Sequence, residues 1–257
     1  MGKPVQVERR GDVAWCTLDR PPLNLLDPEL IAAVHTAFSA FAADAGIRAA
    51  VLTGRGRAFT AGMNVHVLRD LDVPRAKTLI TSLHAMIQSV HHAPFPVIAR
   101  VNGFCLGAGF ELALACDVRV AAEGARLGLP EVRVGLPSVI EAALLPALVG
   151  PGHAAEMLLT RESIDAGQAA AWGLVNRAVP TEELDAAVAA LIDKVLACGP
   201  VAIRLQKELM LRWRHTDLAT AIEYGINAFA TAYATDEPRE GARAFLGKRP
   251  PRFGMST

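Results

Sequence analysis

The chain has 257 residues, of which 52% are hydrophobic and 20% charged, so it is long enough for one large domain with a substantial buried core. Lysine plus arginine and aspartate plus glutamate number 26 each, a balance that argues against nucleic acid or an anionic membrane as a partner. The first residues lack the apolar stretch of a signal peptide, and no uncharged apolar run approaches the ~20 residues of a membrane span. We therefore expect a soluble, cytoplasmic protein that binds neither nucleic acid nor membrane.

Cysteine and histidine usage predicts no metal site. The four cysteines are widely spaced and form no Cys-x-x-Cys pattern, which is typical of reduced, packed side chains. His91 and His92 are adjacent, but no carboxylate or cysteine completes a ligand set beside them. We interpret this pair as the end of a helix.

The first half of the chain alternates strand and helix signals. Two short strand-like runs, 5–8 and 13–18, flank Arg10-Gly11-Asp12 and predict a hairpin. Asp27 is a suitable N-cap with Pro28 at the first helical position, and apolar spacing extends that helix to about Ala43. Further strands are expected at 49–53, 96–101 and 118–121, with a helix at 78–90. This strand–strand–helix rhythm predicts an α/β core with short crossovers.

The last third of the chain is predicted to be helical. Helical patterns cover 182–197, then a stretch that begins at Pro200, then 217–234. We expect a core at 1–199 and a helical subdomain at 200–257. The apolar residues of the subdomain suit packing against a neighbouring subunit or against the protein's own core.

Two glycine-rich elements are candidates for binding a developing negative charge. Ala58-Phe-Thr-Ala-Gly-Met-Asn-Val65 follows a strand, and Gly62 permits a tight turn that leaves the next amide free. Gly107-Ala-Gly109 marks the change from strand to helix, where free N–H groups carry partial positive charge. One N–H from each element, pointing at one site, would form an oxyanion hole. The same glycines are also compatible with tight turns alone, and the Gly-x-Gly-x-x-Gly dinucleotide pattern is incomplete.

Two glutamates follow these turns and are candidates for acid–base chemistry. Glu111 closes the apolar run that contains Gly107 and Gly109, and Glu131 follows Leu129-Pro130. A carboxyl in apolar surroundings has a raised pKa and suits proton transfer near neutral pH. The alternatives are a first-turn acid favoured by the helix dipole for Glu111 and an ordinary loop acid for Glu131.

These motifs together resemble the crotonase (enoyl-CoA hydratase/isomerase) superfamily, and the resemblance covers nearly the whole chain in order. The segments that carry it are Phe59-Thr-Ala-Gly-Met-Asn64, Asn102-Gly-Phe-Cys-Leu-Gly-Ala-Gly-Phe-Glu111, Leu129-Pro-Glu131, Ala169-Ala-Ala-Trp-Gly-Leu-Val175 and Asp236-Glu-Pro-Arg-Glu-Gly241. The resemblance implies a crotonase-like spiral of strand–strand–helix units with a helical trimerisation segment. It also implies a homotrimer or a dimer of trimers, that is, a hexamer.

The resemblance implies an enzyme of fatty acid metabolism that acts on acyl-CoA thioesters. The expected activity is that of a lyase, an enoyl-CoA hydratase that adds water to the 2,3 double bond or removes it. Coenzyme A is then part of the substrate, and no separate cofactor is expected. The alternatives are another crotonase-type reaction (isomerisation, decarboxylation or thioester hydrolysis), a non-catalytic acyl-CoA-binding subunit, or, more remotely, a dehydrogenase.

Site residues follow from the matching positions. Glu111 and Glu131 match the two catalytic acids, and the backbone N–H groups of Met63 and Ala108 match the oxyanion hole. The expected substrate-binding and CoA-binding strip consists of Ala61, Gly62, Met63, Asn64, Val65, His66, Gly107 and Ala108.

The chain departs from the family pattern after the second acid. Hydratases carry a glycine-rich loop there, whereas this chain has the bulkier Gly135-Leu-Pro-Ser-Val-Ile-Glu141, so we expect a reshaped or shorter acyl pocket. Val139 stands where dienoyl-CoA isomerases place an aspartate, which argues against that activity. Glu141 is interpreted as the cap of the following helix, with a third functional acid as the alternative.

Overall fold

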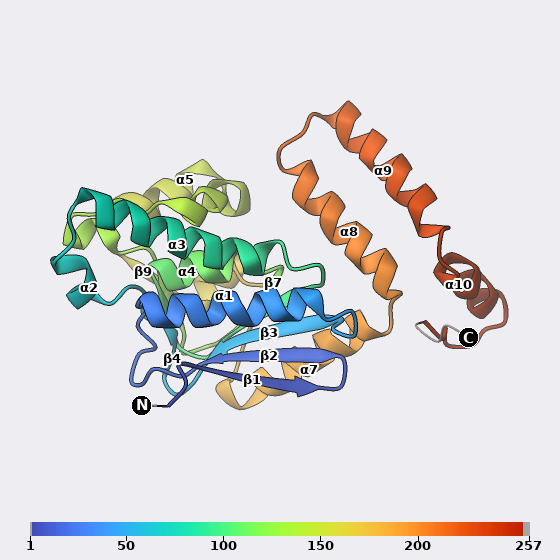
Figure 1. Cartoon of the computed structure of the whole chain (residues 1–257), viewed down its shortest axis with the longest axis horizontal. Helices are drawn as coiled ribbons and strands as arrows, with labels where there is room; N and C mark the ends of the chain where they lie inside the picture. Colours follow the sequence, from blue (N-terminus) through green and yellow to red (C-terminus); the bar gives the residue numbers. More distant parts are fainter. Residues whose placement is uncertain (1, 254–257) are drawn as a thin grey trace.

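Two β-sheets form the scaffold of the protein, which the computed structural model describes for residues 2–253 (Figure 1). The strands are β1 (Val5–Arg10), β2 (Val13–Leu18), β3 (Ala49–Gly54), β4 (Ala58–Thr60), β5 (Val97–Val101), β6 (Phe104–Leu106), β7 (Val118–Ala122), β8 (Arg126–Gly128), β9 (Ser163–Asp165) and β10 (Arg177–Val179). The larger sheet has the order β1-β2-β3-β5-β7-β10, parallel except for the β1–β2 hairpin. The smaller sheet has the order β4-β6-β8-β9, in which β4, β6 and β8 are parallel.

Helices cover the larger sheet and form the last part of the chain. The α-helices are α1 (Pro28–Ala43), α2 (Val65–Arg69), α3 (Val73–His91), α4 (Ala108–Leu114), α5 (Leu145–Leu159), α6 (Ala166–Ala171), α7 (Leu184–Leu196), α8 (Pro200–Trp213), α9 (Leu218–Ala232) and α10 (Glu237–Leu246). Three short 3₁₀ helices are η1 (Glu131–Val134), η2 (Ile140–Leu144) and η3 (Thr181–Glu183).

The strand–strand–helix rhythm is confirmed, and it has a spatial meaning. The pairs β3–β4, β5–β6 and β7–β8 each give their first strand to the larger sheet and their second strand to the smaller one. Each pair is followed by helical structure that returns the chain to the start of the next pair. The chain therefore winds as a spiral, and the expected crotonase-like α/β fold is confirmed.

The central strands of the larger sheet, β3, β5 and β7, are buried on both faces, as the near-continuous apolar character of β3 predicts. Ala50 and Leu52 belong to the main core, which contains α1, α3 and α4. Ala49 and Val51 point to the opposite face, where Leu184 and Val188 of α7 cover them. Figure 1 shows α1 and α3 above the sheet and α7 below it. Because successive side chains of a strand point to opposite faces of the sheet, the apolar residues of β3 belong alternately to two cores.

Most predicted elements are present, and one begins earlier than expected. The N-cap at Asp27 is confirmed, since its carboxylate accepts a hydrogen bond from the Leu30 N–H at 2.8 Å. Helix α3 begins at Val73, five residues before the predicted start, because Asp72 caps it in the same way through the Arg75 N–H. The sequence prediction did not include the helices α2, α5, α6 and α10 or the strands β4, β8, β9 and β10.

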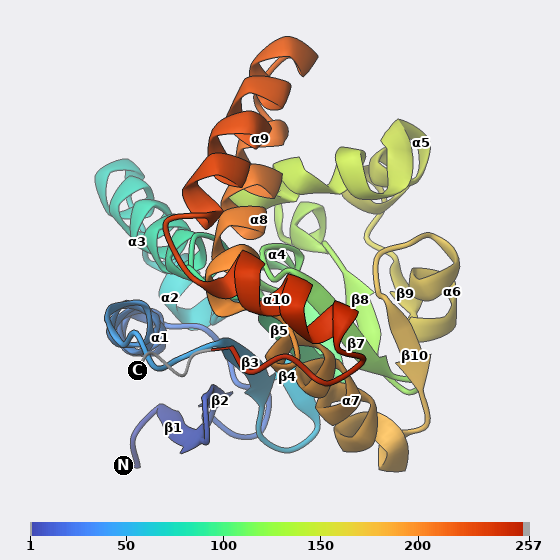
Figure 2. The same cartoon turned by 90° about the vertical axis from the view of Figure 1, so that its right-hand side faces the viewer.

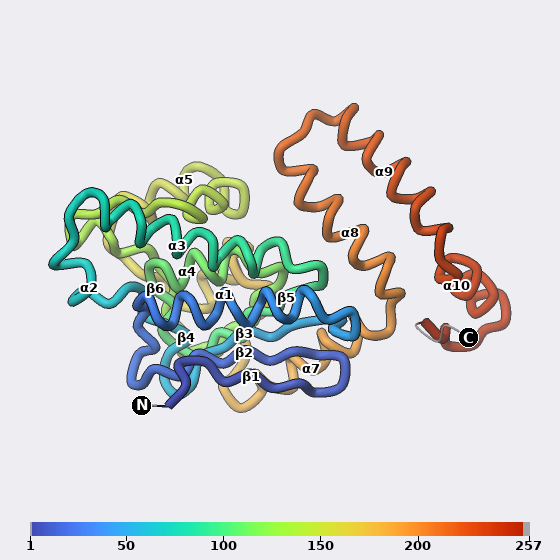
Figure 3. Tube along the Cα trace, viewed as in Figure 1, coloured from blue at the N-terminus to red at the C-terminus, as the bar shows by residue number. Residues whose placement is uncertain are grey.

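The carboxy-terminal helices extend away from the core. Helices α8 and α9 run side by side and project outward, as the tube in Figure 3 shows. Lys207 anchors α8, because its buried ammonium group donates to the Phe95 carbonyl and to Asp117 at 2.8 and 2.7 Å. Glu237 of α10 accepts hydrogen bonds from the first N–H groups of α8, and α10 lies near that end in Figure 2. The extension begins with α8 at Pro200, and the division of the chain into a core and a helical subdomain stays a prediction.

One segment, Ile140–Leu159, is long and apolar enough to be considered as a membrane span. It joins η2 to α5 and is broken at Gly150, where the backbone leaves the helical conformation. Leu145, Ala154 and Met157 in this segment are buried in the protein's own core. The protein's own core thus covers part of the apolar side chains of this segment.

Candidate active site

Three neighbouring parallel strands of the smaller sheet end at the same edge, and the predicted site residues follow them. Met63 comes three residues after β4, Ala108 two residues after β6, and Glu131 three residues after β8. Because the carboxyl ends of parallel strands share one edge, segments far apart in sequence meet there. The structure thus brings the two glycine-rich elements and the second acid together.

Gly62 and Gly107 bring the two elements into direct contact. Both have positive φ angles, +88° and +56°, which glycine adopts far more readily than other residues. A Cβ atom on Gly62 would lie 3.6 Å from the Gly107 Cα, and one on Gly107 would lie 3.9 Å from the Gly62 Cα. A Cβ on Gly62 would also lie 2.8 Å from the Leu106 carbonyl oxygen, so a side chain there would force this backbone to shift.

The amides that follow these glycines have the character of an oxyanion hole. No described residue accepts a hydrogen bond from the Met63 N–H or the Ala108 N–H. The Ala108 N–H is also the first of helix α4, where the helix dipole adds positive potential. Two free donors beside one another can stabilise an oxygen that gains negative charge.

Glu111 lies in α4 with 2% of its surface exposed. Its Oε1 atom accepts a hydrogen bond from the Ala142 N–H at 3.2 Å. Burial, reinforced by the negative charge of Glu131, raises the pKa of Glu111 to about 8. The helix-dipole reading of this residue therefore misses its main property, which is that its carboxyl group holds a proton at neutral pH.

Glu131 is half-buried at the start of η1, directly beside the glycine contact. Its Oε1 atom lies 2.7 Å from the place that a Cβ on Gly107 would occupy. Its Oε2 atom accepts a hydrogen bond from the Ser138 hydroxyl at 2.7 Å. Glu131 thus lies at the start of α4, the helix that carries Glu111, and its charge acts on the Glu111 carboxyl group.

The expected CoA strip lies along the segment between β4 and α2. Asn64 caps α2, since its side-chain oxygen accepts from the His66 N–H at 3.0 Å. Val65 and His66 are exposed, whereas Ala61 and Asn64 are partly buried. The strip is therefore accessible from solvent on its α2 side.

The interpretation of Glu141 as a helix cap is wrong. Val139 occupies the cap position of η2, and no side chain caps that helix. The Glu141 carboxylate instead points to α3, where it contacts His84 and Gln88. These contacts span more than fifty residues of sequence, so no local pattern indicates them.

Sequence reasoning also missed Ser138. Ser138 lies outside any Gly-x-Ser-x-Gly elbow, so the sequence gives no indication of a nucleophile at this position. Its hydroxyl binds a catalytic candidate seven residues earlier, across the turn that ends η1. A serine that follows an acid at this distance gives no recognisable sequence signal.

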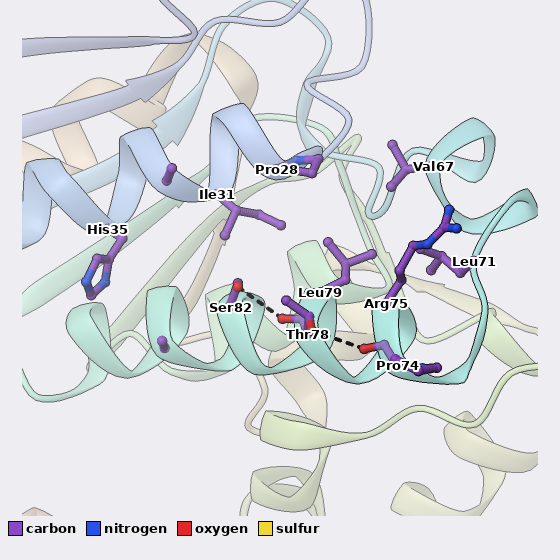
Figure 4. A pocket seen from close by; sticks show the side chains of 12 residues that line it. Pro28, Ile31, His35, Val67, Leu71, Pro74, Arg75, Thr78, Leu79 and Ser82 are labelled. Atoms are coloured by element: carbon purple, nitrogen blue, oxygen red, sulfur yellow. Dashed lines mark hydrogen bonds between the residues drawn. The ribbon is translucent and has the colours of Figure 1, made fainter.

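An apolar groove of about 570 Å³ lies beside the site, between α1, α2 and α3 (Figure 4). Ile31 and His35 of α1 face Leu79 and Ser82 of α3 across it, and Val67 of α2 lies at one end. Its lining contains neither acid and neither oxyanion amide. The groove is thus distinct from the place where the acids meet.

A spiral of strand–strand–helix units places two acids beside two backbone amides that have no acceptor among the described residues. This combination defines the protein as a crotonase-type enzyme. Residues 8–256 match the model of the family described as enoyl-CoA hydratase/isomerase. The chain belongs to this family.

Individual relatives agree over nearly their full length. A crotonyl-CoA hydratase of Syntrophomonas wolfei is 34% identical, with 96% of each chain covered. A putative enoyl-CoA hydratase of Thermus thermophilus is 38% identical over 97% of this chain and 100% of the relative. A crystal structure of an enoyl-CoA hydratase from Bacillus anthracis superposes with a TM-score of 0.94 at 31% identity, covering 98% of this chain and 100% of that one.

Proposed function

We propose that the protein is an enoyl-CoA hydratase that adds water to, or removes it from, the 2,3 double bond of an acyl-CoA thioester. The observation that carries the proposal is the pairing of Glu111, a buried acid whose pKa is raised to about 8, with Glu131 beside two amides that have no acceptor among the described residues. Hydration requires one group to take a proton from water and another to deliver a proton to the α-carbon. Glu111 and Glu131 are assigned to these two roles.

The amides of Met63 and Ala108 are assigned to the thioester oxygen. When water attacks the β-carbon, negative charge develops on that oxygen in an enolate-like transition state. Two preorganised N–H donors stabilise this charge more than the neutral carbonyl, which lowers the barrier. Loss of one donor from such a site costs roughly 10²–10³ in rate.

Water attacks from the side of the acids, and the strip 61–66 is assigned to the CoA portion. Glu111 and Glu131 are assigned to the same face of the double bond, so the proton taken from water and the proton given to the α-carbon are exchanged on that face. Addition on one face is syn addition. The reaction needs no further cofactor, because CoA enters with the substrate.

A panel of enoyl-CoA thioesters tests the proposal directly. Loss of the conjugated enoyl absorbance with crotonyl-CoA, longer chains and polar chains gives the rate, and mass spectrometry identifies the product. Hydration adds the mass of one water to the intact thioester, whereas isomerisation leaves the mass unchanged and hydrolysis releases free CoA. Absence of hydration for every chain length, with Glu111→Gln equal to wild type, would sink the proposal.

The segment 200–257 is proposed to join subunits into a trimer or a dimer of trimers; its last four residues lie outside the described part of the chain. No residue within α9 is buried, yet Leu218, Ile222, Ile226 and Phe229 form an exposed apolar stripe at helical spacing. Light scattering after size exclusion should give a trimer or hexamer mass, and Phe229→Glu should reduce it. A monomeric wild-type protein would contradict this part.

A further inference from the structure

A third carboxyl group lies buried behind the two acids. Glu141 of η2 is 4% exposed, and its Oε1 atom lies 2.7 Å from Nδ1 of His84 and 2.8 Å from Nε2 of Gln88. Both partners lie on successive turns of α3. The carboxylate therefore ties η2 to that helix.

Stability alone is a poor explanation for a carboxylate at this position. The Oε2 atom of Glu141 is buried, and no described residue donates a hydrogen bond to it. A buried polar atom without a partner costs about 1–3 kcal/mol, and a side chain without this second charged oxygen would avoid that cost. This cost points to a role for the negative charge itself.

The adjacent residue connects this carboxylate to the active site. Ala142 follows Glu141 directly, and its N–H donates to Glu111 at 3.2 Å. Helix η2 packs against both α3 and α4. A shift of η2 away from α3 would thus move the donor that holds the Glu111 carboxyl.

We propose that Glu141 is a positioning residue for Glu111: held by His84 and Gln88, it fixes the turn whose Ala142 N–H binds the Glu111 carboxyl and places a second negative charge near it. The expected effect of Glu141 on catalysis rests on the hydratase function proposed above. Its expected effect on the Glu111 carboxyl group does not.

The charged groups that act on Glu111 can be named. Burial is the largest cause of its raised pKa, the charge of Glu131 comes next, and the charge of Glu141 acts in the same direction. His84 faces Glu141 from α3 and is the titratable group on the far side of that carboxylate. Replacing Glu141 with glutamine keeps an oxygen for His84 and Gln88 but removes the charge, whereas alanine removes both.

Carbon-13 NMR of the glutamate carboxyl groups tests the proposal without any substrate. Comparison with Glu111→Gln assigns the Glu111 resonance, and a pH titration then gives its pKa in each folded variant. In Glu141→Gln we expect this pKa to fall by about half a unit to one unit. Glu183→Gln, an exposed glutamate in the 3₁₀ helix η3, is the control and should leave it unchanged.

Kinetics supply the second measurement. In Glu141→Ala we expect kcat to fall about 10- to 100-fold with little change in KM, because a shift of about 1 Å in a catalytic group can cost on the order of 10²-fold. Glu141→Gln should recover most of this loss and move the alkaline limb of the pH–rate profile to lower pH. Circular dichroism and thermal melting confirm that the glutamine variant is folded.

An unchanged Glu111 pKa in folded Glu141→Gln overturns the proposal, whatever the activity. A lowered pKa in a protein that hydrates no enoyl thioester would support the positioning role and refute the hydratase function instead. Equal losses of kcat in the alanine and glutamine variants, with the pKa unchanged, would indicate a structural role only.

Discussion

The Oε1 atom of Glu131 lies 2.7 Å from the position that a Cβ atom would occupy on Gly107. This contact joins the end of β6 to the residue that follows β8. It places the Glu131 carboxylate at Gly107, the residue that precedes α4, and Glu111 lies four residues after Gly107 in that helix. The glycine is thus required for two reasons, its positive φ angle and the space it leaves for the carboxylate.

Replacing Gly107 with alanine is expected to impair catalysis more than folding. The new methyl group would displace the flexible Glu131 side chain, and the backbone strain adds about 1–3 kcal/mol. We expect kcat to fall roughly 10²-fold, with a moderate decrease in Tm. Gly124→Ala is the matched control, because a Cβ there meets nothing within 4 Å. Equal rates for the two variants would contradict the assigned position of Glu131.

The pH–rate profile should show an alkaline limb. The proposed active form has a protonated Glu111, which has a pKa of about 8 and releases its proton as pH rises. We expect kcat/KM to decline above about pH 8 because this parameter reports the free enzyme. Initial rates in overlapping buffers measure it with the substrate that the panel identifies. A flat profile through pH 9 would exclude protonated Glu111 as the active species.

Glu111→Gln should change how stability depends on pH. The Glu111 pKa is raised from 4.5 to about 8 in the folded protein, so between these values the folded state binds more protons than the unfolded state. Ionisation of Glu111 therefore lowers the free energy of unfolding progressively as pH rises through this window. Urea unfolding should show that the glutamine variant gains stability relative to wild type between about pH 5 and pH 8.

The same comparison below pH 4.5 should give a nearly constant difference, because Glu111 is then protonated in both states. Glu183→Gln serves as the exposed control and should follow the wild type across the range. A difference that shrinks with rising pH would mean that Glu111 is ionised in the folded protein.

Lys207→Met should loosen the attachment of α8. The substitution removes the buried ammonium group from Asp117 and from the Phe95 carbonyl. We expect the free energy of unfolding to fall by about 2–4 kcal/mol. This is less than the loss typical of a fully buried ion pair, because the Asp117 side chain is 20% exposed. Denaturant midpoints measure this, and Lys77→Met on the exposed side of α3 should change little. Equal midpoints would show that α8 is held by other contacts.

Local chemistry in the sequence determined much of the fold. Asp27 with Pro28 predicts the start of α1, and the apolar runs that became β3, β5 and β7 are recognisable without a structure. The cap at Asp72 was also present in the sequence, although the apolar pattern placed that helix start later. Caps, turns and periodicity act over a few residues, so the sequence by itself can show them.

The resemblance of ordered motifs to a known family pointed to Met63, Ala108, Glu111 and Glu131 as the site. Only the tertiary structure decided how these residues meet, because β4, β6 and β8 become neighbours through sheet pairing across tens of residues. The same long-range packing buries Glu111, which raises its pKa, and gives Glu141 its partners on α3. Burial and charge proximity are properties of the folded chain, whereas the sequence pattern records only which groups are available.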